Sequence, residues 1–263
     1  MSAHLCMPGR GLSCFACCPP IRPAGYEHLA DRNIWRRIFS ENRRAWRQDR
    51  LPHRPITGFS CYGLGFLDPR GRRVGCLLHP DRNQGRDLRR RTGYADKCAR
   101  ETCPQYRAFA ALSPQARRRL LDLCAGMDPF LFSSRRRNPV MRLLALGPEV
   151  AAAAAGLGLA DIDSLAALAW LRELEPAWGW LLARILERQG APYLLLPELA
   201  GQVHALAAEL TRRLGPSPPL ESGALLVELC GEWEARFWRA VTGRRRARPG
   251  ELAAWRRAAE EVL

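Results

Sequence analysis

Cysteine is the residue type in this chain with the widest chemical potential, and its placement is uneven. Eight of the ten cysteines fall within the first 103 of 263 residues, among glycine, proline, serine and arginine. Even scattering would place about four of them there. The eight are Cys6, Cys14, Cys17, Cys18, Cys61, Cys76, Cys98 and Cys103. Thiols concentrated in polar surroundings favour metal ligation over ordinary packing.

The spacing of these cysteines is typical of metal ligands. Cys14 and Cys17 form a C-x2-C pair, in which a tight turn directs two thiolates at one ion. Cys98 and Cys103 form a C-x4-C pair that is also compatible with a shared ion. Neighbouring side chains of an extended chain point to opposite sides. We therefore expect the adjacent Cys17 and Cys18 to serve two sites, or a polynuclear cluster, or to be one ligand and one core thiol.

Three interpretations of the cysteines compete. A disulfide framework requires an oxidising compartment, and the opening MSAHLCMPGR has no apolar stretch that would serve as a secretory signal. Burial as a small apolar side chain suits Cys124 and Cys230, which lie on apolar faces of expected helices. Metal ligation suits the other eight. Zinc prefers four ligands in a tetrahedron, and iron–sulfur clusters are also held by four cysteines, so both cofactors stay open.

A turn signal between Cys61 and Cys76 predicts a β-hairpin. Asp68-Pro69-Arg70-Gly71 offers a side-chain acceptor, then proline, then a closing glycine. It is flanked by expected strands at 59–67 and 72–78. If Asp68 pairs with Gly71 across the hairpin, Cys61 lies opposite Leu78. Cys76 is then the diagonal neighbour of Cys61 on the same face of the hairpin. Such neighbours are about 7–8 Å apart, unless a one-residue slip moves them to opposite faces.

The opening cluster Ser13-Cys14-Phe15-Ala16-Cys17-Cys18, with the later Gly75-Cys76, resembles the YkgJ-type cysteine-cluster proteins. That family is described as zinc- or iron-chelating. The resemblance covers residues 6–104 and implies that Cys14, Cys17, Cys18 and Cys76 are ligands, with Cys98 or Cys103 as the last. It departs from the family pattern upstream, where Cys6 is eight residues before Cys14, and it implies nothing about residues 144–263.

Charge divides the chain in the same way as cysteine. Residues 1–143 carry 28 basic and 11 acidic residues, whereas residues 144–263 carry 13 and 15. All the basic residues except Lys97 and the histidines are arginine, which reflects a GC-rich genome as much as a binding need. The excess suggests an alternative function, nucleic-acid binding on a zinc-scaffolded N-terminal half. In that case Trp35, Trp46 and Tyr62, interleaved with arginine, would stack on bases.

Periodicity predicts a mainly α-helical α+β protein. A basic, cysteine-rich metal-binding domain with the hairpin is expected over 1–143 and an all-α domain over 144–263, with the alanine run 151–155 at their boundary. In the first domain, a basic helix over 27–47 should turn Ile34, Ile38 and Phe39 inward. Further helices are expected over 161–174, 178–188, 197–215 and 221–242, and after the arginine-rich stretch RRRARPG, which is expected to be a solvated linker.

The sequence contains no recognised catalytic motif: P-loop, nucleophile elbow, dinucleotide fingerprint and zinc-protease signature are all missing. Redox chemistry through the metal centre is the catalysis that fits best. Asp81, Arg82 and Asn83 form a polar loop that could contact a substrate. Without an apolar run of membrane-spanning length, the chain is expected to be cytoplasmic, with its helical domain available to a protein partner.

Overall fold

The computed structural model describes residues 5–9, 11–16, 18, 29–53, 61–100, 103–159, 163–214, 227–228, 231–244 and 246–263. Cys17, Cys230 and residues 59–60 of the first expected hairpin strand lie outside this set. The chain divides into two compact units. Unit 1 comprises Met1–Ala110 and Leu121–Met141, and unit 2 comprises Ala111–Leu120 and Arg142–Leu263. The two separate domains expected on either side of residue 143 stay a prediction, because a compact unit of the structure need not fold on its own.

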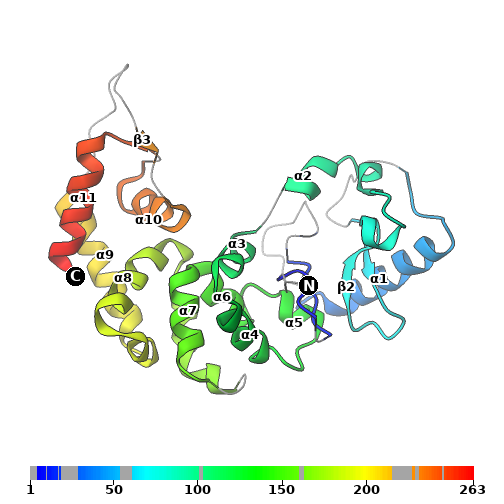
Figure 1. Cartoon of the computed structure of the whole chain (residues 1–263), viewed down its shortest axis with the longest axis horizontal. Helices are drawn as coiled ribbons and strands as arrows, with labels where there is room; N and C mark the ends of the chain where they lie inside the picture. Colours follow the sequence, from blue (N-terminus) through cyan, green and yellow to red (C-terminus); the bar gives the residue numbers. More distant parts are fainter. Residues whose placement is uncertain are drawn as a thin grey trace. The chain divides into compact units, whose positions relative to one another are not determined.

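The predicted mainly α-helical α+β class is confirmed for the described residues (Figure 1). The α-helices are α1 (Arg32–Arg47), α2 (Ala95–Arg100), α3 (Pro104–Ala111), α4 (Pro114–Asp122), α5 (Pro129–Ser133), α6 (Pro139–Leu146), α7 (Pro148–Gly156), α8 (Gly179–Gln189), α9 (Leu199–Leu214), α10 (Glu232–Thr242) and α11 (Pro249–Val262). The 3₁₀ helices are η1 (Pro80–Arg82), η2 (Arg89–Thr92), η3 (Asp163–Glu173), η4 (Pro176–Trp178) and η5 (Ala191–Leu195). Two antiparallel ladders complete the elements: β1 (Leu64–Phe66) with β2 (Val74–Cys76), and β3 (Val227–Glu228) with β4 (Arg246–Ala247).

Unit 1 is built on one cluster of buried side chains, most of them aromatic. The unit 1 core cluster consists of Phe15, Trp35, Phe39, Leu64, Phe66, Val74 and Phe130. Phe39 lies at its centre, with ring centroids 5.3 Å from Phe15, 5.6 Å from Phe66 and 5.9 Å from Phe130. The cluster therefore joins the N-terminal loop, the hairpin and α5 to α1, which runs alongside β1 in Figure 1.

The buried face of α1 differs from the expected one. Trp35 and Phe39, four residues apart, are 1% and 0% exposed, and Ile38 packs at the margin of the core cluster. Ile34 was predicted to point inward, but it is 54% exposed, so that prediction is wrong. Residues four apart share a face of a helix whereas consecutive ones do not, so burying Trp35 and Phe39 turns Ile34 toward solvent.

The hairpin is confirmed, but its predicted register is wrong by one residue. Leu64 pairs with Cys76 and Phe66 with Val74, and Leu67 N–H donates to the Arg73 carbonyl at 2.8 Å. The 68–71 turn does form, but Gly71 adopts a left-handed conformation with φ of 66°. A turn followed by a left-handed glycine is the usual three-residue hairpin loop with a bulge. That extra residue shifts the partner of every position in β2.

Asp68 should be the residue on which this turn depends most. Its carboxylate accepts hydrogen bonds from the backbone N–H groups of Arg70 (3.0 Å), Arg72 (3.3 Å) and Arg73 (2.7 Å). We expect Asp68→Ala to lower the free energy of unfolding by about 2 kcal/mol, measured by urea denaturation. Glu41→Ala is the matched control, since the 3.7 Å ion pair between Glu41 and Arg37 is exposed and its loss should cost under about 0.5 kcal/mol.

The effect of Asp68→Ala should also depend on pH. Burial opposes ionisation of Asp68, but the hydrogen bonds from Arg72, Arg73 and Arg70 outweigh it, so its pKa lies below the ordinary value. A carboxyl with a lowered folded-state pKa stabilises the fold above its unfolded pKa and loses that contribution as pH falls. The difference between wild type and Asp68→Ala should therefore shrink below about pH 4. An equal difference at pH 3 and pH 7 would contradict this account.

Unit 2 packs α8, α9, α10 and α11 against one another (Figure 1). Its core includes Leu165, Leu168, Leu171 and Leu174, all at most 4% exposed. The segment carrying the first three is the 3₁₀ helix η3, with a kink at Leu168, rather than the expected α-helix. The spacing of these leucines explains the difference, because steps of three match the three residues per turn of a 3₁₀ helix.

Three further expectations for unit 2 need correction. The helix expected over 221–242 is confirmed only as α10, and Val227–Glu228 pair with Arg246–Ala247 as a short ladder. The alanine run 151–155 lies inside α7, so it does not mark a boundary between compact units. The arginine-rich stretch is not a simple solvated linker, because the Arg244 guanidinium binds the Glu251 carboxylate with two 3.0 Å hydrogen bonds. Among the described residues, no helix has both the length and the apolar character needed to cross a membrane.

Candidate metal centre

Cys61 lies in a tight turn that leads into β1. Leu64 N–H donates to the Cys61 carbonyl at 3.0 Å, and the Asn42 side-chain amide donates to the carbonyls of Cys61 (3.3 Å) and Leu64 (2.8 Å). A Cβ on Gly63 would lie 2.6 Å from Leu78 Cδ1 and 3.5 Å from Cys61 Sγ. Glycine is therefore the residue that fits between the Cys61 thiol and the Leu78 side chain. Asn42 of α1 holds the turn in place through its two hydrogen bonds.

Cys76 ends β2, opposite the first residue of β1. In this register Cys61 and Cys76 would face opposite sides if both belonged to the pleated strands. Cys61 instead lies in the preceding turn, and its charge raises the pKa of Cys76. The two thiols interact electrostatically. Their predicted placement as diagonal neighbours on one face of the hairpin is wrong, because Cys61 lies outside β1 and the register differs by one residue.

Burial makes both of these thiols weak acids. It raises the pKa of Cys61 to about 11, partly offset by hydrogen bonds from the backbone of Gly63 and Leu64. It raises the pKa of Cys76 to about 12, again partly offset, by a hydrogen bond from the backbone of Leu78. The negative charge of Cys98 raises both values further, so the three sulfur atoms lie within electrostatic reach of one another.

The N-terminal loop with Cys14 and Cys18 is attached directly to the hairpin. The buried Ser13 hydroxyl accepts a hydrogen bond from Val74 N–H at 2.8 Å. Ser13 directly precedes Cys14 in the loop, and Val74 is two residues before Cys76 in β2. Phe15 N–H donates to the Ser133 hydroxyl at 2.9 Å, which fixes the loop to α5. Cys18 and Cys61 both pack at the margin of the unit 1 core cluster.

Cys6 and Cys98 are connected to this region through the backbone. Cys14 N–H donates to the Cys6 carbonyl at 3.0 Å, so the two loop cysteines are neighbours. Cys98 is exposed on α2, and its carbonyl accepts a 3.1 Å hydrogen bond from Arg89 on η2. Cys103 directly precedes α3 and is half-buried.

Backbone donors point at the sulfur atoms of several predicted ligands. Ala16 N–H donates to Cys14 Sγ at 3.4 Å, and Tyr106 N–H donates to Cys103 Sγ at 3.4 Å. Cys61 and Cys76 receive similar backbone hydrogen bonds. Hydrogen bonds to the charged form favour a thiolate, and hydrogen bonds to sulfur are one of the features that tune iron–sulfur centres.

Arg89 supplies positive charge beside the cysteines. Its guanidinium is held by Asp87 at 2.6 Å, and that hydrogen bond lowers the pKa of Asp87 to about 2. Interaction with the Cys76 and Cys98 thiolates contributes to the raised pKa of Arg89, after its hydrogen bond to Asp87. A fixed guanidinium at this position can offset the charge of thiolates that hold a cation.

The structure thus brings the segments with Cys6, Cys14, Cys18, Cys61, Cys76 and Cys98 together through backbone contacts or charge, and Cys17 lies outside the described residues. It does not place them as a finished ligand set. Within the described ranges, no three His, Cys, Asp or Glu side chains are arranged to hold a metal ion. Cys124 is 0% exposed, as predicted for a packing residue, and burial raises its pKa to about 12.

Two residues that matter for this region were not expected from the sequence. Asn42 positions the Cys61 turn and Ser13 joins the N-terminal loop to β2, and neither gives a sequence signal because each depends on a distant partner. Asn83 was considered for substrate contact. Its amide instead donates to the carbonyls of Leu77 and His79, both at 2.8 Å, so it stabilises the loop after β2.

The aromatic residues suggested for base stacking are engaged in the fold. Trp35 is 1% exposed in the core, so the expectation that it stacks on a base is wrong. The Trp46 indole N–H donates to Asn83 Oδ1 at 3.3 Å, and the Tyr62 hydroxyl donates to the Arg91 carbonyl at 2.7 Å. Both side chains are half-buried.

Comparison of the chain with protein-family models, with curated proteins and with solved structures finds no match in any of the three.

Proposed function

We propose that unit 1 is a metal-binding module in which cysteine thiolates hold a structural zinc ion or an iron–sulfur cluster. The proposed ligands come from Cys14, Cys18, Cys61, Cys76 and Cys98, with Cys6, Cys17 and Cys103 as the remaining candidates. The observation that supports this most is the attachment of the N-terminal cysteine loop to β2 by Ser13, beside Cys76. Segments some sixty residues apart thereby meet through the Ser13–Val74 hydrogen bond, one residue before Cys14 and two residues before Cys76.

The chemistry of the region supports a cation more than it supports packing. Backbone donors stabilise negative charge on the sulfur atoms of Cys61 and Cys76, and Arg89 does so for Cys76. Burial without a cation opposes that charge and keeps the thiols protonated. A bound metal reverses this balance, because it replaces the protons and pairs with the thiolates. The YkgJ-type resemblance at Cys14, Cys18 and Cys76 agrees with this function. With a cluster in place, the module would serve electron transfer or redox sensing.

Metal binding should release protons from the buried thiols. At pH 7 the thiols of Cys61 and Cys76, with pKa values of about 11 and 12, are protonated before metal arrives. Binding of Zn²⁺ to chelator-treated protein under argon should release at least about two protons per ion. The apparent affinity should rise steeply from pH 6 to pH 8, measured by competition with a chromogenic chelator. Proton-free, pH-independent binding would contradict the proposed ligands.

The two cofactors can be separated by reconstitution. One sample receives Zn²⁺, and another receives ferrous iron and sulfide. A stable visible absorption band after desalting supports the cluster, whereas tight retention of colourless zinc alone supports the structural ion. Cys124→Ser is the matched control, because Cys124 is buried in unit 1 but receives a side-chain hydrogen bond from Asn138 and lies outside the proposed ligand set. It should retain metal like the wild type.

A further inference from the structure

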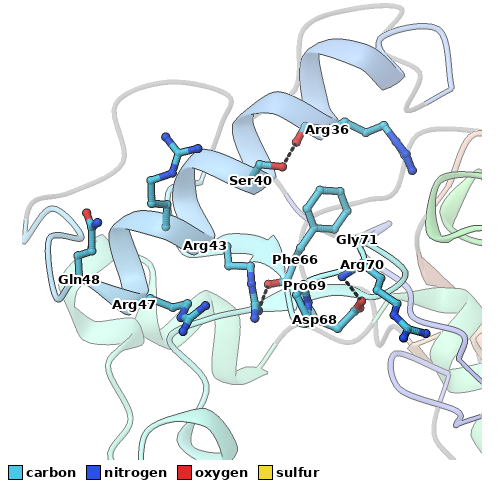
Figure 2. A pocket seen from close by; sticks show the side chains of 11 residues that line it. Arg36, Ser40, Arg43, Arg47, Gln48, Phe66, Asp68, Pro69, Arg70 and Gly71 are labelled. Atoms are coloured by element: carbon cyan, nitrogen blue, oxygen red, sulfur yellow. Dashed lines mark hydrogen bonds between the residues drawn. The ribbon is translucent and has the colours of Figure 1, made fainter.

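One face of α1 presents a stripe of arginines that the metal-binding proposal does not use. Arg36, Arg43, Arg44 and Arg47 line one wall of a groove, together with Ser40 and Gln48. These positions follow the repeat of the helix, and the eleven steps of 1.5 Å from Arg36 to Arg47 extend the stripe over about 16 Å. Figure 2 shows the labelled arginines of the helix beside the hairpin turn.

The opposite wall is the hairpin turn. It consists of Phe66, Asp68, Pro69, Arg70 and Gly71, and the groove between the two walls has a volume of about 640 Å³. Arg43 donates to the Phe66 carbonyl at 3.0 Å and joins the walls (Figure 2). This contact, together with the core under Phe39 and Phe66, fixes the separation of the walls before any ligand arrives.

The charge of the groove is strongly one-sided. Five guanidinium groups line it, from Arg36, Arg43, Arg44, Arg47 and Arg70, against the single carboxylate of Asp68. That carboxylate already accepts three backbone hydrogen bonds. Within the described part of the chain, none of the five guanidinium groups forms an ion pair, and the buried Nε of Arg36 has no hydrogen-bond partner. Five guanidinium groups in one groove that form no ion pair within the described residues favour an anionic ligand.

The length and lining of the groove indicate the class of anion. A stripe of about 16 Å is longer than a single phosphate needs, and arginine forks match phosphate oxygens. The aromatic ring in the groove, Phe66, is only 5% exposed, so it offers no platform for base stacking. The anion that fits this groove is therefore a row of phosphates along a polymer backbone.

We infer that this arginine groove binds the phosphodiester backbone of a nucleic acid, independently of base sequence. Phosphate contacts supply affinity and position but carry no sequence information. The groove contains none of the proposed metal ligands, and the inference stands without a metal centre. It replaces the stacking role considered for Trp35 with an electrostatic one.

The test compares two triple variants of the full chain that remove the same charge from unit 1. Arg44→Gln/Arg47→Gln/Arg70→Gln changes exposed arginines of the groove, whose side chains make no hydrogen bond among the described residues. Arg135→Gln/Arg136→Gln/Arg137→Gln changes three exposed arginines elsewhere in the same unit. Circular dichroism and melting curves confirm that both variants fold. Fluorescence anisotropy then measures binding of a labelled single strand and a labelled duplex of unrelated sequences.

The groove variant should bind at least about tenfold more weakly than wild type at low salt, and the control variant within about twofold. The slope of log affinity against log salt on duplex DNA should fall by about 2 to 3 in the groove variant, because each lost phosphate contact removes about 0.9. Equal weakening in both variants would overturn the inference, as would no binding at low salt. Binding of inorganic polyphosphate without binding of either nucleic acid would also overturn it.

Discussion

Cys76→Ser is expected to abolish stoichiometric metal binding by the protein. Serine nearly keeps the size of the side chain at the end of β2 but removes the sulfur atom, which interacts electrostatically with Cys61, Cys98 and Arg89. A structural zinc contributes about 10–16 kcal/mol to the folding of small metal domains, and a lost ligand removes a large part of that. Metal retained after anaerobic purification should fall close to zero, measured by elemental analysis.

The stability of Cys76→Ser separates a lost ligand from a local packing defect. Its melting temperature should be lower than that of wild type, and a chelator should lower the wild-type value toward it while leaving the variant unchanged. Cys124→Ser should lose some stability, because Cys124 is 0% exposed, yet keep its metal and its response to chelator. Metal retention by Cys76→Ser at the wild-type level would contradict the assignment of Cys76.

Phe39→Ala is expected to produce the largest stability loss among core substitutions of unit 1. Phe39 is 0% exposed and its ring lies between 5.3 and 5.9 Å from those of Phe15, Trp35, Phe66 and Phe130. Truncating a buried phenylalanine costs about 3–5 kcal/mol, because the cavity left behind closes only in part. Denaturant unfolding, followed by tryptophan fluorescence and circular dichroism, measures the change in free energy.

Ile34→Ala is the matched control on the same helix. Ile34 is 54% exposed, so its truncation should cost less than about 0.5 kcal/mol. Phe39→Ala should also speed hydrogen exchange in the N-terminal loop, since Phe15 packs directly on Phe39. Similar costs for Phe39→Ala and Ile34→Ala would mean that the core of unit 1 does not lie where the structure places it.

Local signals in the sequence were sufficient to predict the elements of the hairpin but not its register. The Asp68–Gly71 signal specified a turn, and the turn is present. Gly71 adopts a left-handed conformation and adds a bulge to the hairpin. The twist of the strands packed on α1 decides whether such a bulge forms, and the local sequence does not show that twist. The expected same-face position of Cys61 and Cys76 depended on that register, so it fails with it, and their electrostatic interaction depends instead on the turn before β1.

Helical periodicity predicted well where one face alone is apolar. The helix expected over 178–188 is present as α8 with nearly the same bounds. The helix expected over 221–242 is too long, because Val227–Glu228 form β3 and α10 begins after Gly231, whose φ is 76°. An α-helix was expected at Leu165, Leu168 and Leu171, but their steps of three fit the observed 3₁₀ helix better.

The arginine groove shows what composition could not provide. The sequence showed an excess of arginine and its period along α1, but the second wall depends on the hairpin folding back onto that helix. The Asn42 and Ser13 contacts have the same origin. Long-range hydrogen bonds of this kind link residues that no local pattern pairs.

The metal content of wild-type protein, purified under argon without added metal, tests the central claim most directly. Elemental analysis should find about one zinc ion per chain, or iron and acid-labile sulfide in the ratio of a cluster with a visible absorption band. Protein that is folded by circular dichroism and resists denaturant, yet contains neither metal, would contradict the account.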